Sequence, residues 1–165
     1  MPSIYLSDSQ FSVGMYNSTV LGHYNNPRNV GEIEDADGVG IYMSDYCGDI
    51  TKFWIKVDGG RITGAKYRTQ GCAASIACGS VLTELVKGKT VEEALGITKD
   101  DIVSALDGLP EYKVHCSVLA DDSLKDAIRD YLARNNLPIP RELAEKNERM
   151  RPLIEGMRQR GYVLI

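Results

Sequence analysis

Five side chains of types that bind metals stand at three separate places in this chain: Cys47 with Asp49, then Cys72, then the pair His115-Cys116. Three thiolates with a carboxylate or an imidazole can fill a tetrahedral zinc site or hold an iron–sulfur cluster. Because the three places are far apart in the sequence, only a folded domain can bring these side chains together. We therefore predict a functional metal or cluster site rather than a local structural zinc.

The chemistry of this ligand set favours a cluster that is assembled and then released. Cys72 and Cys116 each stand at or just before a predicted helix N-terminus, where the helix dipole favours thiolate over thiol. Thiolates bind iron–sulfur clusters and can also take sulfur from a persulfide. Asp49 is a hard oxygen ligand among soft ones, so a cluster that it holds is easier to release.

The fourth cysteine and the histidines allow other interpretations. Cys78 lies about 240° further round a helix than Cys72, so we expect a buried core residue. A thiol redox enzyme that uses a Cys72–Cys78 pair is the alternative. For His115, its place beside Cys116 favours a metal role over simple packing. For His23, which is far from every cysteine, we expect a structural role.

Composition excludes several classes of function. The 19 Lys and Arg against 23 Asp and Glu give a net charge of −4, which offers no general attraction to nucleic acid. No apolar run reaches the roughly 18–20 residues that span a bilayer, and the N-terminus has no signal or transit pattern. We therefore expect a cytoplasmic protein with neither nucleic acid nor membrane as a partner. Thiols stay reduced there, so four cysteines indicate a metal or catalytic site instead of disulfides.

Strand patterns come first along the chain and helical patterns follow. Gly59-Gly60 between two alternating segments predicts a β-hairpin, with Phe53 and Ile55 on its buried face and Trp54 on its solvent-facing side. We expect a short helix in 15–24, strands in 39–43, 51–58 and 61–69, and helices in 72–87, from 90, from 98, from Ser117 to 135 and in 141–160, the last broken near Pro152.

This order of elements predicts the α+β class. We expect a small antiparallel three-stranded sheet with helices packed on one face, plus an extra C-terminal helix. Residues 1–137 are predicted to form the domain and residues 138–165 a C-terminal helical extension. A contact of this extension with a partner or a second copy of the chain is a further hypothesis. It is suggested by four apolar residues among the charges: Leu143, Met150, Ile154 and Met157.

Five segments resemble the iron–sulfur cluster assembly scaffolds of the IscU and NifU N-terminal family. They run in family order and at family spacing: His23–Gly31, Cys47–Asp49, Gly71–Ala77, Val86–Leu95 and Lys113–Ala120. The resemblance extends from about Tyr16 to Asn135. It implies the SufE/NifU-like fold and a scaffold without turnover chemistry of its own, not an enzyme.

The resemblance also implies roles for the site residues. The ligands of a nascent [2Fe–2S] or [4Fe–4S] cluster would be Cys47, Cys72 and Cys116, together with Asp49 or His115. Zinc often occupies the same site in cluster-free relatives. A cysteine desulfurase would supply sulfur, with Cys116 as the first persulfide acceptor and Cys72 as the second choice, and apo-proteins would receive the cluster. Three thiolates suit one cluster in a monomer or a cluster shared by a homodimer.

One segment departs from the family pattern. The chaperone-recognition segment of the family has a second proline and a valine that Leu109–Lys113 lacks. The resemblance therefore does not predict binding of an Hsp70-type chaperone. The main rival function is a zinc-bearing sulfur-relay protein that accepts persulfide and activates a desulfurase without building clusters.

Overall fold

The three-stranded antiparallel sheet that the sequence predicts is present in the structure. The computed structural model describes residues 15–162. Neighbouring strands pair antiparallel in the order β1 (Gly38–Met43), β2 (Ile50–Asp58) and β3 (Arg61–Gln70). Both glycines of the Gly59-Gly60 turn have positive φ angles, a conformation that glycine adopts without steric cost. The predicted hairpin is therefore confirmed.

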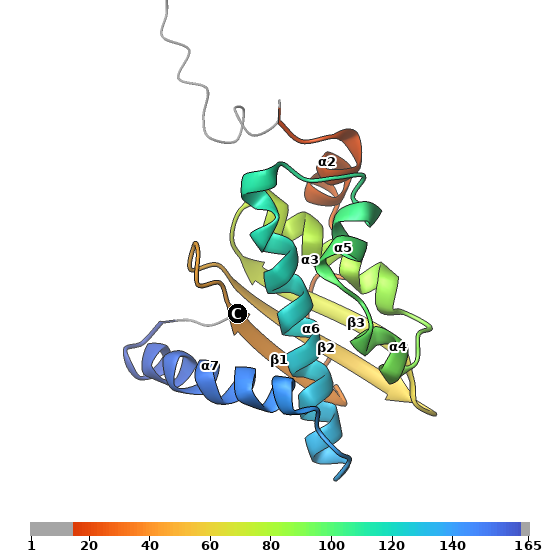
Figure 1. Ribbon diagram of the computed structural model, residues 1–165, viewed down its shortest axis with the longest axis vertical. Helices are drawn as coiled ribbons and strands as arrows, with labels where there is room; N and C mark the ends of the chain where they lie inside the picture. The colour runs from red at the N-terminus through yellow and green to blue at the C-terminus, as the bar shows by residue number, and fades with distance from the viewer. Residues whose placement is uncertain (1–14, 163–165) are drawn as a thin grey trace, which may run out of the picture.

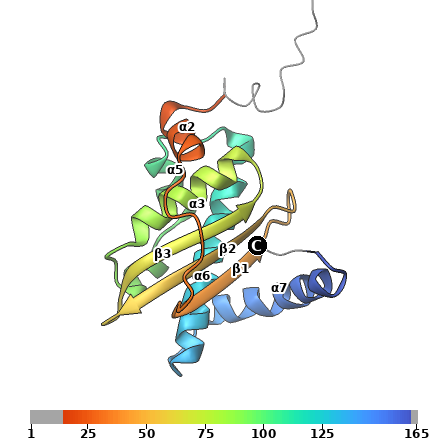
Figure 2. The ribbon, with the colours of Figure 1, turned by 180° about the vertical axis from the view of Figure 1, so that it is seen from behind.

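Helices cover one face of this sheet. α3 (Ala73–Val86) and α6 (His115–Arg134) pack on it, and α6 crosses in front of the strands in Figure 1. The other helices are α2 (Ser18–Asn25), α4 (Val91–Leu95), α5 (Lys99–Ala105) and α7 (Arg141–Gln159), with a 3₁₀ turn at Glu111–Lys113. Figure 2 shows the opposite face, where the segment before β1 runs along β3 and Val30 pairs with Tyr67. The predicted α+β architecture is confirmed.

The main core lies between the sheet and the layer of α3 and α6. Phe53 and Ile55 of β2 are fully buried there, as the alternation predicts, and Tyr67 of β3 joins them. Trp54 faces the other side of the sheet, yet it is also buried, and the Lys52 ammonium lies 5.1 Å from its ring centre. The prediction of a wet second face is therefore wrong at Trp54, where a cation–π contact accompanies the burial of the indole.

β1 and α6 approach each other so closely that only glycine fits at Gly40. A Cβ at this position would overlap backbone atoms of α6. The Asp126 carboxylate on α6 accepts a hydrogen bond from the Ile41 N–H at 3.0 Å, and the Asp130 carboxylate accepts one from the Val39 N–H at 2.8 Å. β1 is an edge strand, so some of its backbone N–H groups have no strand to pair with. α6 packs on β1 and also supplies the acceptors for two of these N–H groups.

The predicted break near Pro152 is wrong, because α7 continues without interruption from Arg141 to Gln159. Proline lacks an N–H and disfavours the interior of a helix. On either side of it, however, Met150 and Ile154 are buried against residues of β1 and α6. This tertiary packing holds both halves of α7 in place and outweighs the local preference.

The predicted start of α6 at Ser117 is also wrong. α6 begins at His115, directly after the 3₁₀ turn, and Ser117 lies inside its first turn. The Ser117 hydroxyl donates a hydrogen bond to the Val114 carbonyl at 2.5 Å instead of capping the helix. Cys116 is consequently a residue of the helix itself and not of the loop before it.

Three of the four apolar residues that suggest a partner contact for the C-terminal helix serve the fold of this chain, while Met157 is half-buried. Leu143 is buried, and Met150 and Ile154 pack with Tyr42 of β1 and Leu119 of α6. Their burial is therefore explained without a partner. Within residues 15–162, none of the helices combines the length and apolar character that crossing a bilayer requires.

Candidate metal centre

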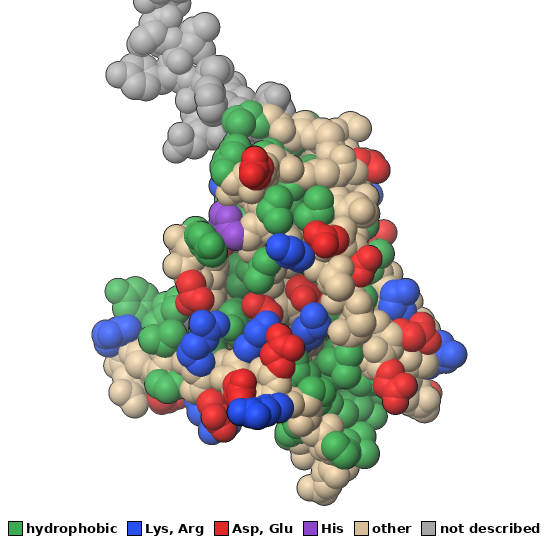
Figure 3. Space-filling view, viewed as in Figure 1, with side chains coloured by type: hydrophobic (Ala, Val, Ile, Leu, Met, Phe, Trp, Pro, Cys, Tyr) green, Lys and Arg blue, Asp and Glu red, His purple; other side chains and the backbone are tan. Residues whose placement is uncertain are grey.

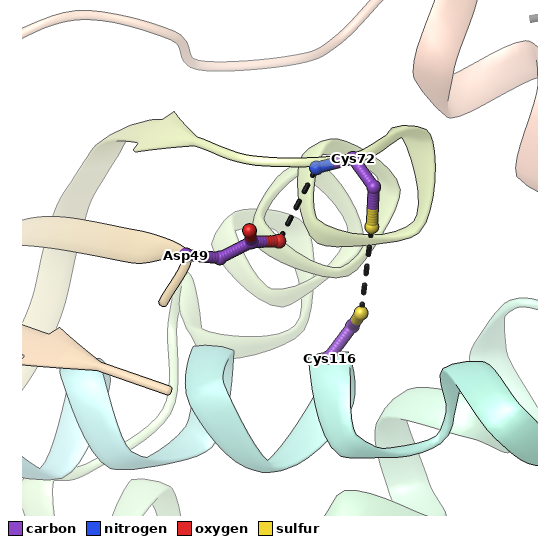
Figure 4. Close-up of side chains that lie close together, drawn as sticks. All are labelled: Asp49, Cys72 and Cys116. Atoms are coloured by element: carbon purple, nitrogen blue, oxygen red, sulfur yellow. Dashed lines mark hydrogen bonds between the residues drawn. The ribbon is translucent and has the colours of Figure 1, made fainter. Parts of the chain in front are cut away.

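The ends of two strands and two helices meet at one end of the sheet. Asp49 directly precedes β2, Cys72 follows β3 as the residue before α3, and Cys116 is the second residue of α6. The hairpin register pairs Ile50 with Gln70, which brings the residues beside them together. Figure 4 shows the side chains of Asp49, Cys72 and Cys116 pointing toward one another there. One ligand atom from each lies within 4.8 Å of the others.

Hydrogen bonds hold these three side chains in place. The two sulfur atoms of Cys72 and Cys116 are 3.6 Å apart, and both residues are free thiols. Asp49 Oδ2 accepts hydrogen bonds from the Cys72 N–H at 3.2 Å and from the Ser75 hydroxyl at 2.8 Å. A Cβ at Gly71 would overlap the Asp49 carboxylate. The glycine before Cys72 is therefore needed for the carboxylate to reach the N-terminus of α3.

The two thiols share one proton in this arrangement. The hydrogen bond with Cys116 lowers the pKa of Cys72 to about 5, with Ser75 and the charge of Lys113 assisting against the effect of burial. The same hydrogen bond, together with burial, raises the pKa of Cys116. Burial lowers the pKa of Lys113, but the negative charge of the thiol pair beside it outweighs this effect and raises that pKa. The pair therefore loses its first proton more readily than an isolated thiol, and the more exposed Cys72 is the favoured site of the thiolate.

Cys47 and His115 lie outside this group. Cys47 is exposed in the loop between β1 and β2, and the half-buried His115 ring stacks on Tyr46 with ring centres 5.4 Å apart. Both residues line one hollow of about 550 Å³ together with Tyr112. Gly48, next to Cys47, has a φ of 72° and open space where a Cβ would be. The structure thus brings together three of the five predicted ligands and leaves Cys47 and His115 at the edge of the site.

Cys78 and His23 occupy the structural positions that the sequence predicts. Cys78 is fully buried in the core, and this burial raises the pKa of its thiol. His23 is buried, and its Nδ1 lies 2.7 Å from the Ser80 hydroxyl. The thiol contact of Cys72 is with Cys116 instead, so the geometry does not support a Cys72–Cys78 redox pair.

Ser75 is a site residue that its sequence position alone does not reveal. It is buried, donates to the Asp49 carboxylate, and its oxygen lies 3.6 Å from the Cys72 sulfur. The available signal is its spacing, because a residue three positions after Cys72 shares the first turn and face of α3. That signal becomes informative only when Asp49 is known to lie opposite.

The alkylation rate of Cys72 in metal-free protein is expected to stay nearly constant between about pH 6 and 8. A thiol with its pKa at about 5 is already thiolate across this range, whereas an unperturbed thiol would react roughly 80-fold faster at the upper end. Mass spectrometry of the Cys72 peptide after timed iodoacetamide pulses measures the rate. Cys116→Ala removes the thiol that donates to Cys72, so the alkylation rate of Cys72 should then rise with pH. A steep rise in the unmodified chain would contradict the shared-proton arrangement.

Comparison with known proteins identifies the class of protein that this fold and site define. Residues 15–137 match the model of the NifU-like N terminal domain. Iron–sulfur cluster assembly scaffold protein IscU 1 of Archaeoglobus fulgidus is 54% identical over 121 residues, which cover 73% of this chain and 79% of that protein. The scaffold protein IscU of Haemophilus influenzae is 47% identical over 123 residues, which cover 72% of this chain and 97% of that protein.

Solved structures share the fold. A NifU-like N-terminal protein from Brucella abortus matches with a TM-score of 0.63 at 22% identity, covering 73% of this chain and 96% of that one. A scaffold protein for the SUF system from Fervidobacterium islandicum matches with a TM-score of 0.57 at 25% identity, covering 71% and 98%. This chain belongs to the NifU-like N-terminal domain family. The resemblance that the sequence indicates is confirmed.

Proposed function

We propose that this chain is a scaffold on which an iron–sulfur cluster is assembled and from which the cluster is passed to apo-proteins. The observation that carries the proposal is the convergence of Asp49, Cys72 and Cys116 in a chain of this family. Relatives at 47% and 54% identity are named iron–sulfur cluster assembly scaffold proteins. The cluster is cargo, and the chain performs no turnover of its own. In this proposal residues 1–137 are the scaffold domain, which the family match over 15–137 supports.

The three grouped side chains supply the first ligands. Cys116 gives up its proton when metal binds, since only thiolate is a ligand. Cys47 completes the set in our proposal, because rotation at the unhindered Gly48 can carry it towards the other thiols. His115, at the rim, is the alternative fourth ligand. Such a set suits a [2Fe–2S] or a [4Fe–4S] cluster, or zinc in the cluster-free chain, and a homodimer could share one cluster with fewer ligands from each copy.

Sulfur enters by thiol exchange in this proposal. A thiolate of the chain attacks the outer sulfur of a persulfide on a cysteine desulfurase, and the desulfurase cysteine leaves as thiolate as its S–S bond breaks. Reduction of each transferred sulfur to sulfide takes two electrons from an electron-donating partner. Cys72 is more exposed than Cys116 and carries the thiolate. We therefore assign the first attack to Cys72, with Cys116 as the second acceptor, which reverses the order implied by the family resemblance.

A zinc-bearing sulfur relay is the second candidate function. One observation favours it: the ligand atoms of Asp49, Cys72 and Cys116 lie within 4.8 Å of one another, close enough to bind one metal ion. Zn²⁺ accepts thiolate and carboxylate ligands in a tetrahedral site. Such a protein would accept persulfide and activate a desulfurase without assembling clusters.

Anaerobic reconstitution with iron, cysteine and a cysteine desulfurase tests the proposal. We expect a coloured protein that contains iron and sulfide and transfers its cluster to an apo-ferredoxin. Cys116→Ala should abolish assembly, whereas Cys78→Ala, which removes a thiol of the core, should retain it. A colourless protein that keeps zinc and still accepts persulfide would overturn the scaffold proposal in favour of sulfur relay.

A further inference from the structure

α7 lies outside the part of the chain that matches the family, yet it is built into the molecule beside the site. The family model ends at residue 137, and α7 begins at Arg141. Figure 1 shows α7 running alongside β1, and Figure 3 shows acidic and basic side chains interleaved over this part of the surface. No role for α7 can therefore be carried over from the family, and its contacts must define one.

Buried carboxylates on α6 fix the position of α7. Asp122 has 8% of its side chain exposed and receives the Lys146 ammonium of α7 at 2.8 Å. Asp126, similarly buried, accepts a hydrogen bond from the Asn147 amide at 3.1 Å. A buried carboxylate that loses its partner is strongly unfavourable. Together with the apolar packing of Met150, these pairs hold α7 in a single docked position.

From this position Arg149 of α7 reaches the loop that carries two of the proposed ligands. We call residues 44–49 the site loop. One Arg149 nitrogen donates to the Tyr42 hydroxyl at 2.6 Å, and another donates to Asp45 Oδ2 at 3.4 Å. Tyr42 is buried at the end of β1, and Asp45 is the second residue of the site loop. Arg149 therefore joins a fixed strand and a fixed helix to an exposed loop.

Apart from the Asp49 carboxylate, which Cys72 and Ser75 hold, and the Tyr46 ring, which stacks on His115, the site loop has few other constraints. Two backbone hydrogen bonds close it, from the Ser44 N–H to the Asp49 carbonyl at 2.8 Å and from the Gly48 N–H to the Ser44 carbonyl at 3.1 Å. Gly48 contributes conformational freedom of its own. Fixing Asp45 limits the movable part of the loop to the residues around Cys47. Ordering these residues in advance reduces the entropy that ligand binding must otherwise overcome.

We propose that Arg149 is a positioning residue that holds the base of the site loop from α7, so that Cys47 stays within reach of the thiols and a cluster is retained longer. The effect on the cluster rests on the proposed function, whereas the effect on the loop does not. In this chain the C-terminal helix is thus part of the site and regulates how long the site keeps its cargo.

Two readouts on Arg149→Met in the full-length chain test the inference. In the cluster-free protein, hydrogen exchange of the Ser44 and Gly48 amides should rise about two- to fivefold, because the Arg149–Asp45 pair is exposed. In the reconstituted protein, the cluster half-life in the presence of a chelator should fall by a similar factor. Asp45→Asn should give a smaller effect in the same direction that does not add to that of Arg149→Met. Arg149→Lys should restore part of the loss, because lysine keeps the charge with only one donor group.

Arg158→Met is the matched control, since Arg158 is an exposed arginine of the same helix. Equal exchange rates in Arg149→Met and Arg158→Met would overturn the inference, as would faster exchange with an unchanged cluster half-life. A chain that binds no cluster in any variant would overturn the proposed function instead. The exchange result does not depend on the cluster and would still show whether Arg149 positions the loop.

Discussion

Replacing Gly40 with alanine is expected to lower the free energy of unfolding by about 3 kcal/mol, at the upper end of the usual range for overpacking. The added Cβ would overlap the backbone nitrogen of Ala127 and the backbone oxygen of Ser123 on α6. Backbone atoms in a helix cannot move aside as a side-chain tip can, so β1 and α6 would have to separate. Since β1 leads into the site loop and α6 carries Cys116, the separation would also disturb the metal centre.

Gly22→Ala is the matched control for this substitution. A Cβ at Gly22, inside α2, would meet nothing within 4 Å. Alanine there should raise the free energy of unfolding by about 0.5–1 kcal/mol, because it loses less conformational entropy than glycine in a helix. Urea unfolding followed by circular dichroism measures both changes. A Gly40→Ala value within about 0.5 kcal/mol of the unmodified chain would contradict the close approach of β1 and α6.

The Asp49→Ala variant is expected to hold a reconstituted cluster about tenfold longer than the unmodified chain, a change of about 1.4 kcal/mol in the activation free energy of release. Asp49 is the hard ligand of the set, and Ser75 and the Cys72 N–H compete with a metal for its Oδ2 atom. Asp49 is also more exposed than Cys116, so an incoming thiolate of an acceptor protein reaches it first. Removing the carboxylate closes this route of ligand exchange.

Absorbance decay in the presence of a chelator, followed by transfer to an apo-ferredoxin, measures the effect. Asp45→Ala is the control, because it removes the same charge from the same loop without touching the thiols. It should shorten the half-life through the lost contact with Arg149, the opposite of the Asp49→Ala effect. If both variants lengthened the half-life, the cause would be the loss of negative charge and not the loss of a ligand.

Local signals in the sequence predicted most elements of the fold. The alternation around Phe53 and the Gly59-Gly60 turn located the hairpin, and both are properties of a few consecutive residues. The wrong predictions concern residues whose structure depends on contacts between elements far apart in the sequence. Pro152 remains helical because Met150 and Ile154 pack on β1 and α6, which no local pattern can show. Trp54 is buried on the face that the alternation predicts to be solvent-exposed, with the Lys52 ammonium over its ring.

For the candidate site, the sequence alone shows which ligand types are available: thiols, one carboxylate and an imidazole at the ends of predicted elements. It did not determine which of them meet. Hairpin register and the packing of α3 and α6 bring Asp49, Cys72 and Cys116 together, whereas Cys47 and His115 stay at the rim.

The tertiary structure also decided the roles of residues that local patterns leave without meaning. Ser75 supports Asp49, the Cys116 contact favours the thiolate on Cys72, and Arg149 contacts Asp45 of the site loop from a helix outside the family domain. The physical reason is how far apart in the sequence the interacting residues lie. Hydrophobic period, turns and caps depend on neighbouring residues, whereas distances of 3–4 Å between side chains far apart in the sequence depend on how whole elements pack.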